Sequence, residues 1–386
     1  MARPIHVAIL GASGYGAGEL LRLLTQHAAA EVVSVTSTSR VREPVSRVHP
    51  HLRGFYDLTI SETVNLPRLL DAEQAVVFST LPHGASGAAI DGLLRQIERG
   101  GGANEAGARV KVIDLSADFR LRDERLHAVH YPESAAMPER RRAFVYGLPE
   151  LYREEIRRAR FVANPGCLAT AAILAAAPLA RDGRFSGPLV IDAKTGSSGS
   201  GSSLKETTHH PTRHADFRAY KPLAHQHEPE ILQALNDPHG QRVRLSFVPQ
   251  SMDAARGIYV TAHLALDAHR SERDAQSAPP PGEGRGGGLT ETGTEALRER
   301  YLSFYADCPF IRVLDEPPTL QDVVGSNFCD ISVAARPRPS GGAQVIVMAA
   351  LDNLVKGMAG TAIQNMNLMC GLEETTGLWS PSFRPL

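Results

Sequence analysis

The stretch AILGASGYGAGELLRLL, residues 8–24, decides the first half of the fold. An apolar run ends at Leu10, four glycines follow, and a Leu-rich helical pattern begins among them. Glycines in such a turn let backbone N–H groups approach a pyrophosphate, whose charge then faces the start of the helix. The alternative is a purely structural turn. We predict a dinucleotide-binding loop whose cofactor contacts are Gly11, Ser13, Gly14, Tyr15 and Gly16.

The residues on either side of this stretch alternate short β-branched runs with helical patterns. This alternation is typical of a parallel sheet covered by helices on both faces. The predicted strands are Ile5–Leu10, Val32–Thr36, Ala75–Thr80 and Val110–Leu115, and the predicted helices are Gly14–Gln26 and Ser86–Arg99. The Gly-rich segment Gly100–Gly107 is predicted to be a mobile loop.

From about Asn164 onward, β-rich runs dominate, which predicts a mixed α+β second domain. The segment 276–288 contains APPPGEGRGGG and is predicted to be a disordered surface insertion. The chain then closes with a helix at about Leu354–Cys370. The predicted strands of the second domain are Leu189–Lys194, Val243–Val248, Gly257–Leu266, Phe328–Ala335 and Ala343–Leu351.

The end of the second strand indicates which nicotinamide cofactor is bound. An NAD site places Asp or Glu there to bind the ribose 2′-hydroxyl. Here the strand ends VTSTSR, with Ser37, Ser39 and Arg40 and no acid. Hydroxyls and a guanidinium suit a 2′-phosphate, so we predict NADP(H). A solvated loop is the alternative.

Cys167 is the most informative single residue. In VANPGCLATAAILAAAPL it follows a Pro-Gly turn and begins an apolar helix. The dipole and free N–H groups of a helix start stabilise a thiolate, so we expect a lowered thiol pKa and a nucleophilic sulfur. The other three cysteines have no such setting, and the wide spacing of all four excludes a zinc motif and makes a disulfide framework unexpected in a chain of this size.

A cysteine nucleophile needs a partner for proton transfer. The segment AHQHEPEILQAL supplies His225 and His227 in one extended segment, with Glu230 in the following helix. Glu230 is in a position to orient an imidazole across the turn. A metal pair is the rival interpretation, but no third ligand is near, and we predict no metal. Arg120 in DLSADFRL and Lys205 in GSSGSGSSLK are predicted to contact phosphate or carboxylate groups of an anionic substrate.

The composition of the chain excludes several functional classes. Its 386 residues carry 41 Lys+Arg against 42 Asp+Glu, a formal charge of -1, so no general attraction to nucleic acid is expected. No apolar run approaches the roughly 20 residues that span a bilayer, and the N-terminus lacks the pattern of a signal peptide. We expect a cytoplasmic protein that acts on a small molecule.

These motifs together resemble the N-acetyl-γ-glutamyl-phosphate reductase family, within the aspartate-semialdehyde dehydrogenase superfamily. The resemblance covers nearly the whole chain in order. It rests on GASGYGAGELLRLL, HPHLRG, STLPHG, DLSADFR, YGLPELYR, NPGC, HQHEPEI, RGIYVTAHL, VVGSNFCDISV and LDNLVKGMAGTAIQ.

The resemblance implies a Rossmann-type NADP-binding domain, residues 1–165 and 354–386, and a substrate and oligomerisation domain, residues 166–353. It implies that an acyl phosphate is reduced to an aldehyde through a thioester on Cys167. His227 would be the acid–base group and His225 would lie near the substrate carboxylate, although the reverse order stays open. A homodimer or homotetramer is expected. The resemblance also implies four further cofactor contacts: Pro82, Ser198, Gly199 and Asn353.

Two features depart from the usual pattern of the family. The nucleotide loop has Gly16–Ala17–Gly18, in which Ala17 is still small enough for close helix–strand packing. The stretch KETTHHPTRHADFRAYKPL resembles a sister group that reduces aminoadipyl or glutamyl phosphates held on a small acidic carrier protein. A carrier-linked substrate is therefore the main alternative. Aspartate-semialdehyde dehydrogenase and a non-enzymatic NADP-binding regulator are more distant ones.

Overall fold

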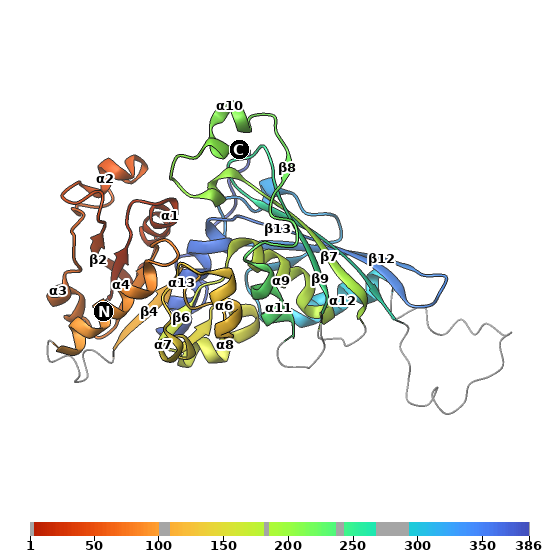
Figure 1. Cartoon of the computed structure of the whole chain (residues 1–386), viewed down its shortest axis with the longest axis horizontal. Coiled ribbons are helices and arrows are strands. Elements are labelled where there is room, and N and C mark those ends of the chain that lie inside the picture. Colours follow the sequence, from red (N-terminus) through yellow and green to blue (C-terminus); the bar gives the residue numbers. More distant parts are fainter. Residues whose placement is uncertain (1–3, 100–108, 181–184, 237–242, 268–292, 386) are drawn as a thin grey trace.

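The computed structural model describes residues 4–99, 109–180, 185–236, 243–267 and 293–385. The predicted loop at 100–107 and the predicted insertion at 276–288 lie outside these described residues. Two sheets with their own helices lie side by side along the longest axis of the molecule (Figure 1). The α/β fold class predicted from the sequence is confirmed.

The first sheet has six parallel strands in the order β2-β1-β3-β4-β6-β5. The order reverses between β1 and β3, which is where dinucleotides cross sheets of this type. The short strands β5 and β6 were not predicted from the sequence. The strands are β1 (Ile5–Leu10), β2 (Ala30–Thr36), β3 (Ala75–Ser79), β4 (Val110–Asp114), β5 (Phe144–Tyr146) and β6 (Phe161–Ala163), and the helices are α1 (Tyr15–Leu24), α2 (Val45–Val48), η1 (Pro50–Leu52), α3 (Leu66–Leu70), α4 (Ser86–Ile97), α6 (Glu124–His130), α7 (Pro138–Arg142), α8 (Pro149–Arg158) and α13 (Gly360–Met369).

The second sheet has seven strands in the order β11-β12-β13-β10-β7-β9-β8. It is mixed, because β7 with β9 and β11 with β12 are parallel pairs and the other pairs are antiparallel. The strands are β7 (Phe185–Thr195), β8 (Arg218–Ala219), β9 (Leu245–Ser251), β10 (Ile258–Leu266), β11 (Ile311–Val313), β12 (Cys329–Pro337) and β13 (Ala343–Leu351), and the helical segments are α9 (Cys167–Ala180), η3 (Ser197–Ser200), η4 (Glu206–Thr208), α10 (His210–Arg213), α11 (Glu228–Asn236), α12 (Thr294–Phe304), η5 (Leu320–Asp322) and the π-helical turn η6 (Val355–Ala359).

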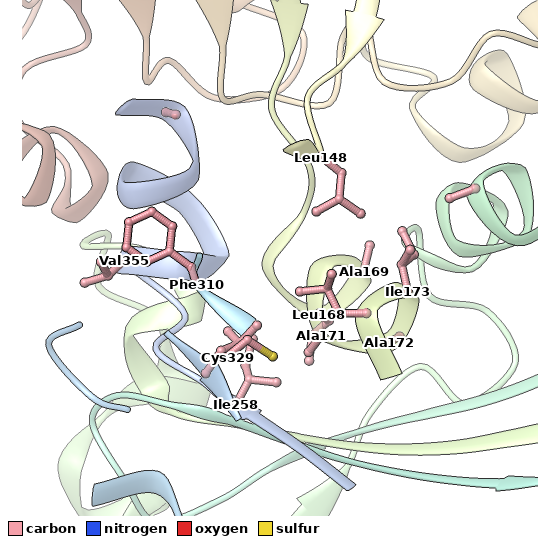
Figure 2. Packing of buried hydrophobic residues seen from close by; sticks show 14 of the residues in the cluster. Leu148, Leu168, Ala169, Ala171, Ala172, Ile173, Ile258, Phe310, Cys329 and Val355 are labelled. Carbon is pink, nitrogen blue, oxygen red and sulfur yellow. The ribbon is translucent and has the colours of Figure 1, made fainter. Parts of the chain in front are cut away.

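Helix α9 is the buried axis of the second domain, and its Ala- and Leu-rich sequence has a direct cause. Every residue after Cys167 is buried, so the helix is apolar on all sides. Figure 2 shows its first turns between Leu148 and the sheet residues Ile258 and Cys329. Pro178 cannot donate to the carbonyl four residues earlier. The hydroxyl of Tyr305 donates to that carbonyl, the Leu174 oxygen, at 2.6 Å.

A buried charge network joins the two sheets. Arg256, two residues before β10, lies 2.9 Å from the Oε1 atom of Glu19 on α1 and 3.0 Å from the Oδ2 atom of Asp352 after β13. Asp352 also accepts from the backbone N–H groups of Leu354 and Val355 and so begins η6. From η6 the chain enters α13, which packs on α8 and β4 of the first sheet. The nucleotide loop and the turn η6 are thus held together. In the part of the chain that the structure describes, no helix is both long and apolar enough to cross a membrane.

Candidate active site

A cavity of about 630 Å³ lies between the two sheets and collects most of the predicted catalytic and substrate residues. The start of α9, the ends of β3 and β4, the loop after β7, and η6 all contribute to its wall. Cys167, His225, His227, Arg120 and Lys205 line it together. A larger hollow of about 990 Å³ lies beside α8 and the end of α13, but none of the predicted site residues lines it. We therefore place the site in the smaller cavity.

Cys167 is the first residue of α9 and is partly exposed to the cavity. Glycine is required at position 357 of η6, because a Cβ there would lie 2.7 Å from the Cβ of Cys167. Burial raises the pKa of the Cys167 thiol to about 11, although the nearby Arg120 charge lowers it in part. The predicted lowering of this pKa is therefore wrong. Desolvation in the closed pocket outweighs the electrostatic help of the helix start.

The turn before Cys167 is fixed by a buried carboxylate. The Oε1 atom of Glu230 accepts from the backbone N–H of Gly166 and from the Tyr146 hydroxyl, both at 2.7 Å. Its Oε2 atom lies 3.6 Å from the Nη1 atom of Arg120. Glu230 is fully buried behind the cavity wall and is hydrogen-bonded to neither imidazole. It thus positions the Pro-Gly turn, which differs from the predicted role of orienting a histidine.

Arg120 has little freedom to follow a substrate. Its Nε atom donates to the Asn164 carbonyl and its Nη2 atom donates to the Leu115 carbonyl, both at 2.8 Å. A Cβ at Gly166 would lie 2.9 Å from the Nη1 atom, so the guanidinium is packed against the turn that carries Cys167. Arg120 therefore supplies a fixed positive charge to the cavity from its wall.

The two predicted histidines differ in their hydrogen bonds. The Nδ1 atom of His225 accepts from the backbone N–H of His227 at 3.1 Å, so a neutral His225 carries its proton on Nε2. The Nδ1 atom of His227 has no hydrogen-bond partner among the described residues, and its Nε2 atom lies 2.3 Å from where a Cβ on Gly166 would be. Burial lowers the pKa of His225 to about 2 and holds the pKa of His227 well below its usual value. Both rings are neutral near pH 7. The acceptor nitrogen of His225 is occupied by a backbone N–H, whereas no described residue occupies either ring nitrogen of His227.

The opposite wall of the cavity is basic, which the residue-by-residue analysis of the sequence did not reveal. Arg213, Arg218 and Lys221 line it beside the predicted Lys205, and no carboxylate of the described residues lines the cavity. Arg213 donates to the Ser251 hydroxyl and the Met252 carbonyl. The available signal was the basic stretch KETTHHPTRHADFRAYKPL, but only the strand pairing of β8 with β9 brings its cations to one face.

The nucleotide loop fits a pyrophosphate. Gly11 has a φ of +87°, and a Cβ there would lie 3.1 Å from the backbone nitrogen of Leu81 in the loop after β3. Gly14 caps α1 and has nothing within 4 Å of its missing side chain, so this face of the loop is open. Glycine at position 16 has a different cause, since a Cβ there would lie 2.7 Å from the Met358 sulfur of η6. The neighbouring Ser13 and the exposed Tyr15 belong to the same turn.

The other predicted cofactor residues fall into two groups. Ser37 and Ser39 lie at the end of β2, with their hydroxyls 3.4 Å apart, and the exposed Arg40 lies 3.3 Å from Glu43. The second group lies at the ends of strands of the second sheet, where the Nδ2 atom of Asn353, after β13, donates to the hydroxyl of Ser198, after β7, at 2.9 Å.

Two further predicted contacts adjoin these groups. Gly199 faces the Thr195 hydroxyl, which would be 3.2 Å from an added Cβ. Pro82 is exposed on the loop after β3. Metal ligation has no support in the described residues, which contain no group of three His, Cys, Asp or Glu side chains able to hold an ion.

The reactivity of Cys167 should depend steeply on pH. Only the thiolate is alkylated, and a pKa of about 11 leaves a thiolate fraction that grows about tenfold per pH unit below that value. We expect the rate of Cys167 alkylation by iodoacetamide in the free enzyme to rise between pH 7 and pH 10 without a plateau. Peptide mass spectrometry separates this site from the three buried cysteines. A plateau near pH 7 would instead indicate the lowered pKa expected for an exposed helix start.

Models of known families match both halves of the chain. Residues 6–159 match the semialdehyde dehydrogenase NAD-binding domain, and residues 167–279 and 288–353 match the semialdehyde dehydrogenase dimerisation domain. Among solved structures, aspartate semialdehyde dehydrogenase II of Vibrio cholerae aligns with a TM-score of 0.60 at 16% identity over 96% of this chain and 99% of its own. The NADP complex of the Candida albicans aspartate semialdehyde dehydrogenase aligns at 0.58, with 13% identity over 95% of this chain and 98% of its own. These likenesses show the fold.

Closer relatives extend over the full length. N-acetyl-gamma-glutamyl-phosphate reductase of Methanopyrus kandleri is 42% identical over 99% of this chain and 100% of its own, and that of Pelotomaculum thermopropionicum is 39% identical over 99% of both. A relative from Aeropyrum pernix, named as a LysW-L-2-aminoadipate/LysW-L-glutamate phosphate reductase, is 38% identical over 100% of both chains. The chain therefore belongs to the N-acetyl-γ-glutamyl-phosphate reductase family of the semialdehyde dehydrogenases.

Proposed function

We propose that this protein acts in the cytoplasm as an NADPH-dependent reductase that converts N-acetyl-γ-glutamyl phosphate into N-acetyl-glutamate 5-semialdehyde and phosphate. The observation that carries the proposal is the meeting, in one cavity, of the thiol of Cys167 and the uncommitted imidazole of His227. The names of the relatives at about 40% identity supply the substrate. An arginine-biosynthetic role follows from that substrate.

The first half of the reaction forms a thioester. The sulfur of Cys167 attacks the acyl carbon, its proton passes to His227, and the C–O bond to phosphate breaks. Because the thiol is protonated and the imidazole neutral near pH 7, proton transfer accompanies attack and no thiolate–imidazolium pair is formed in advance. Backbone N–H groups of the first turn of α9 have no acceptors within the helix, so they are available to the oxyanion.

The second half releases the aldehyde. When bound, the nicotinamide supplies the hydride that reduces the thioester carbonyl. Hydride addition leaves an oxyanion on the former carbonyl oxygen. As this oxyanion re-forms the C=O bond, the C–S bond breaks and His227 returns its proton to the sulfur, so the aldehyde leaves and Cys167 is again a thiol. The basic wall of Lys205, Arg213, Arg218 and Lys221 holds the anionic remainder of the substrate throughout. The neutral donor His225 lies beside this wall and suits the substrate carboxylate.

The direct test uses the reverse reaction with purified full-length protein. We expect reduction of NADP⁺ to require both N-acetyl-glutamate 5-semialdehyde and inorganic phosphate. Absence of phosphate dependence would exclude the acyl-phosphate reaction, and absence of any turnover would favour a non-enzymatic nucleotide-binding role. Aspartate semialdehyde serves as the negative substrate.

A carrier-linked acyl phosphate is the second candidate, and one observation favours it. The cations of the segment that bears the basic wall suit an acidic protein, and the same segment exposes the apolar side chains of Leu204, Phe217 and Leu223. The Aeropyrum relative carries the corresponding name. Parallel assays with the acetylated and the carrier-bound substrate separate the candidates, since kcat/KM for the true substrate should be higher by orders of magnitude.

Selectivity for NADPH is expected to depend on Arg40. Arg40 follows Ser37 and Ser39 in the segment after β2, where a ribose 2′-phosphate is bound in this type of sheet, and its guanidinium pairs with Glu43. Loss of one charge-assisted contact in Arg40→Ala should raise the KM for NADPH about tenfold and leave that for NADH unchanged. Arg47→Ala is the matched control, because both arginines are exposed and both pair with Glu43. Equal KM values for NADH and NADPH in the unaltered enzyme would refute NADP selectivity.

The second sheet supplies the surface proposed for a homodimer or homotetramer. Buried and half-exposed residues alternate along β10, where Tyr259, Thr261 and His263 stay half-exposed. The buried residues face α9, so the half-exposed ones lie on the other face of the sheet. A matched family model is described as a dimerisation domain over these strands. Light scattering at several protein concentrations gives the oligomeric state.

A further inference from the structure

His83 lies in the wall of the active-site cavity, although the mechanism above does not use it. It belongs to the loop after β3, which packs against the nucleotide loop where Gly11 approaches Leu81. Both loops follow strands that meet at the reversal of strand order in the first sheet. His83 is therefore placed between the expected path of the cofactor and the thiol of Cys167.

The ring of His83 is held in one orientation and one tautomer. Its Nδ1 atom accepts from the backbone N–H of Ala117 at 2.9 Å. The ring also makes an edge contact with Tyr131, with the centroids 5.5 Å apart. The next residues of the two loops are also joined, because the carboxylate of Asp118 accepts from the backbone N–H of Gly84 at 2.8 Å. Because Nδ1 is occupied by a donor, a neutral His83 must carry its proton on Nε2.

Neutrality of this ring has a physical basis. Burial and the nearby Arg120 charge lower the pKa of His83, while Asp118, Glu133 and Glu230 act in the opposite direction. The carboxylate of Asp118 is occupied by the N–H groups of Gly84 and Gly87 and by the Ser134 hydroxyl. Near neutral pH the ring therefore presents a neutral N–H donor. No described residue accepts a hydrogen bond from Nε2.

The two walls of the cavity suit different ends of the substrate. The basic wall on the second domain suits the carboxylate end, and the acyl carbon must lie at the sulfur of Cys167. The phosphoryl group then faces the wall formed by the first domain. Two of the three guanidinium nitrogens of Arg120 in that wall are already committed to backbone carbonyls. The third nitrogen, Nη1, lies 3.6 Å from the Oε2 atom of Glu230. The Nε2–H group of His83 is therefore the side-chain donor of this wall that has no partner in the described part of the chain.

We propose that His83 is a third active-site imidazole, a fixed donor whose Nε2–H binds a phosphoryl oxygen of the acyl phosphate and of inorganic phosphate in the reverse reaction. The assignment rests on the proposed function. His83 transfers no proton, since its Nδ1 atom stays with Ala117 throughout. It orients the leaving group and spreads the charge that develops on it as the C–O bond breaks.

Two isosteric replacements separate this role from a structural one. In His83→Asn the side-chain oxygen can take the position of Nδ1 and accept from Ala117, but nothing replaces the Nε2 donor. In His83→Gln the amide nitrogen can take the position of Nε2, but the contact with Ala117 is lost. The assay is the oxidation of N-acetyl-glutamate 5-semialdehyde by NADP⁺, with inorganic phosphate varied and turnover followed by NADPH absorbance.

We expect His83→Asn to raise the KM for phosphate by about tenfold to a hundredfold, the range for a lost hydrogen bond to a charged group. The KM values for the aldehyde and NADP⁺ should stay within about twofold, and His83→Gln should keep most of the phosphate affinity. An unchanged phosphate KM in His83→Asn overturns the proposal. So does a larger loss in His83→Gln than in His83→Asn, which indicates a structural role, or a shift confined to the KM for NADP⁺.

The outcome is readable even where a variant does not fold. Melting temperatures identify such a variant, and the phosphate KM of the other one then decides, because each has its own expected value. Failure of the proposed function looks different. In that case the unaltered enzyme shows no phosphate-dependent oxidation, whereas a failure of the His83 assignment leaves the unaltered enzyme active.

Discussion

Replacing Cys167 with alanine is expected to abolish turnover, by about ten-thousandfold or more in kcat, while NADPH still binds. In the proposed mechanism the sulfur forms the covalent bond that divides the reaction into acyl transfer and hydride transfer, and no other cysteine among the described residues lines the cavity. The methyl group of alanine fits the space beside Gly357, so the start of α9 should be preserved. Steady-state kinetics and NADPH fluorescence titration measure the two properties separately.

Cys370→Ala is the matched control for this experiment. Burial raises the pKa of the Cys370 thiol to about 11, as at Cys167, but Cys370 is buried after α13 and lies outside the active-site cavity. We expect it to leave kcat within about twofold, as is usual for a substitution remote from the chemistry. Retained reductase activity in Cys167→Ala would refute the covalent route. Lost NADPH binding in that variant would show that the substitution disturbs the fold.

The same cysteine shows how far the sequence alone leads. The Pro-Gly turn and the apolar run after it predict a thiol at a helix start, and α9 begins at that residue. The direction of the pKa was predicted wrongly, because burial depends on Gly357 and on the opposite domain, which meet Cys167 only in the folded chain. Local patterns report the helix and its dipole, but they do not report the solvent that tertiary packing removes.

Other parts of the fold and the site also separate into those that local sequence predicts and those that only the folded chain shows. The parallel sheet follows from the alternation of runs, because each strand is buried on both faces and its sequence records this. Asn353 was expected only from the family resemblance, and it lies 155 residues from Ser198 in the sequence, yet their side chains are hydrogen-bonded. The basic wall and His83 depend on the strand register and the packing of loops, so their residue types alone did not place them in the site.

The contacts of η6 also explain how the nucleotide loop keeps its tight turn although Gly16–Ala17–Gly18 departs from the usual pattern of the family. Gly16 is required by the Met358 sulfur, and Ala17 is buried with its methyl group in the core. Met358 belongs to η6, and its backbone carbonyl accepts from the Asn164 side chain at 3.1 Å. One π-helical turn therefore contacts the nucleotide loop through Met358, the start of α9 at Cys167 through Gly357, and Asn164 at the end of β6. A change of this turn should alter cofactor binding and thiol position together.

Replacing His227, one of the two histidines of HQHEPEI, is expected to have the second large effect on kcat. His227→Gln is expected to lower kcat by about a hundredfold to ten-thousandfold, the range for loss of a general acid–base group. The Nε2 atom of His227 lies against the Gly166 turn beside Cys167 and has no hydrogen-bond partner among the described residues, so the neutral ring can accept a proton there and return it. His225→Asn keeps an acceptor for the His227 N–H and should raise the KM for the substrate, with kcat within about tenfold.

Chemical rescue separates proton transfer from a positioning role. In His227→Ala, imidazole added to the assay should restore part of kcat and should act more strongly above its own pKa, where the neutral base predominates. No rescue is expected in His225→Ala, because the lost ring acts there as a fixed donor. If His225→Asn costs more in kcat than His227→Gln, the roles are reversed. The backbone N–H of His227 would then have to release the Nδ1 atom of His225 during the reaction, since a ring nitrogen that already accepts a hydrogen bond cannot also receive the thiol proton.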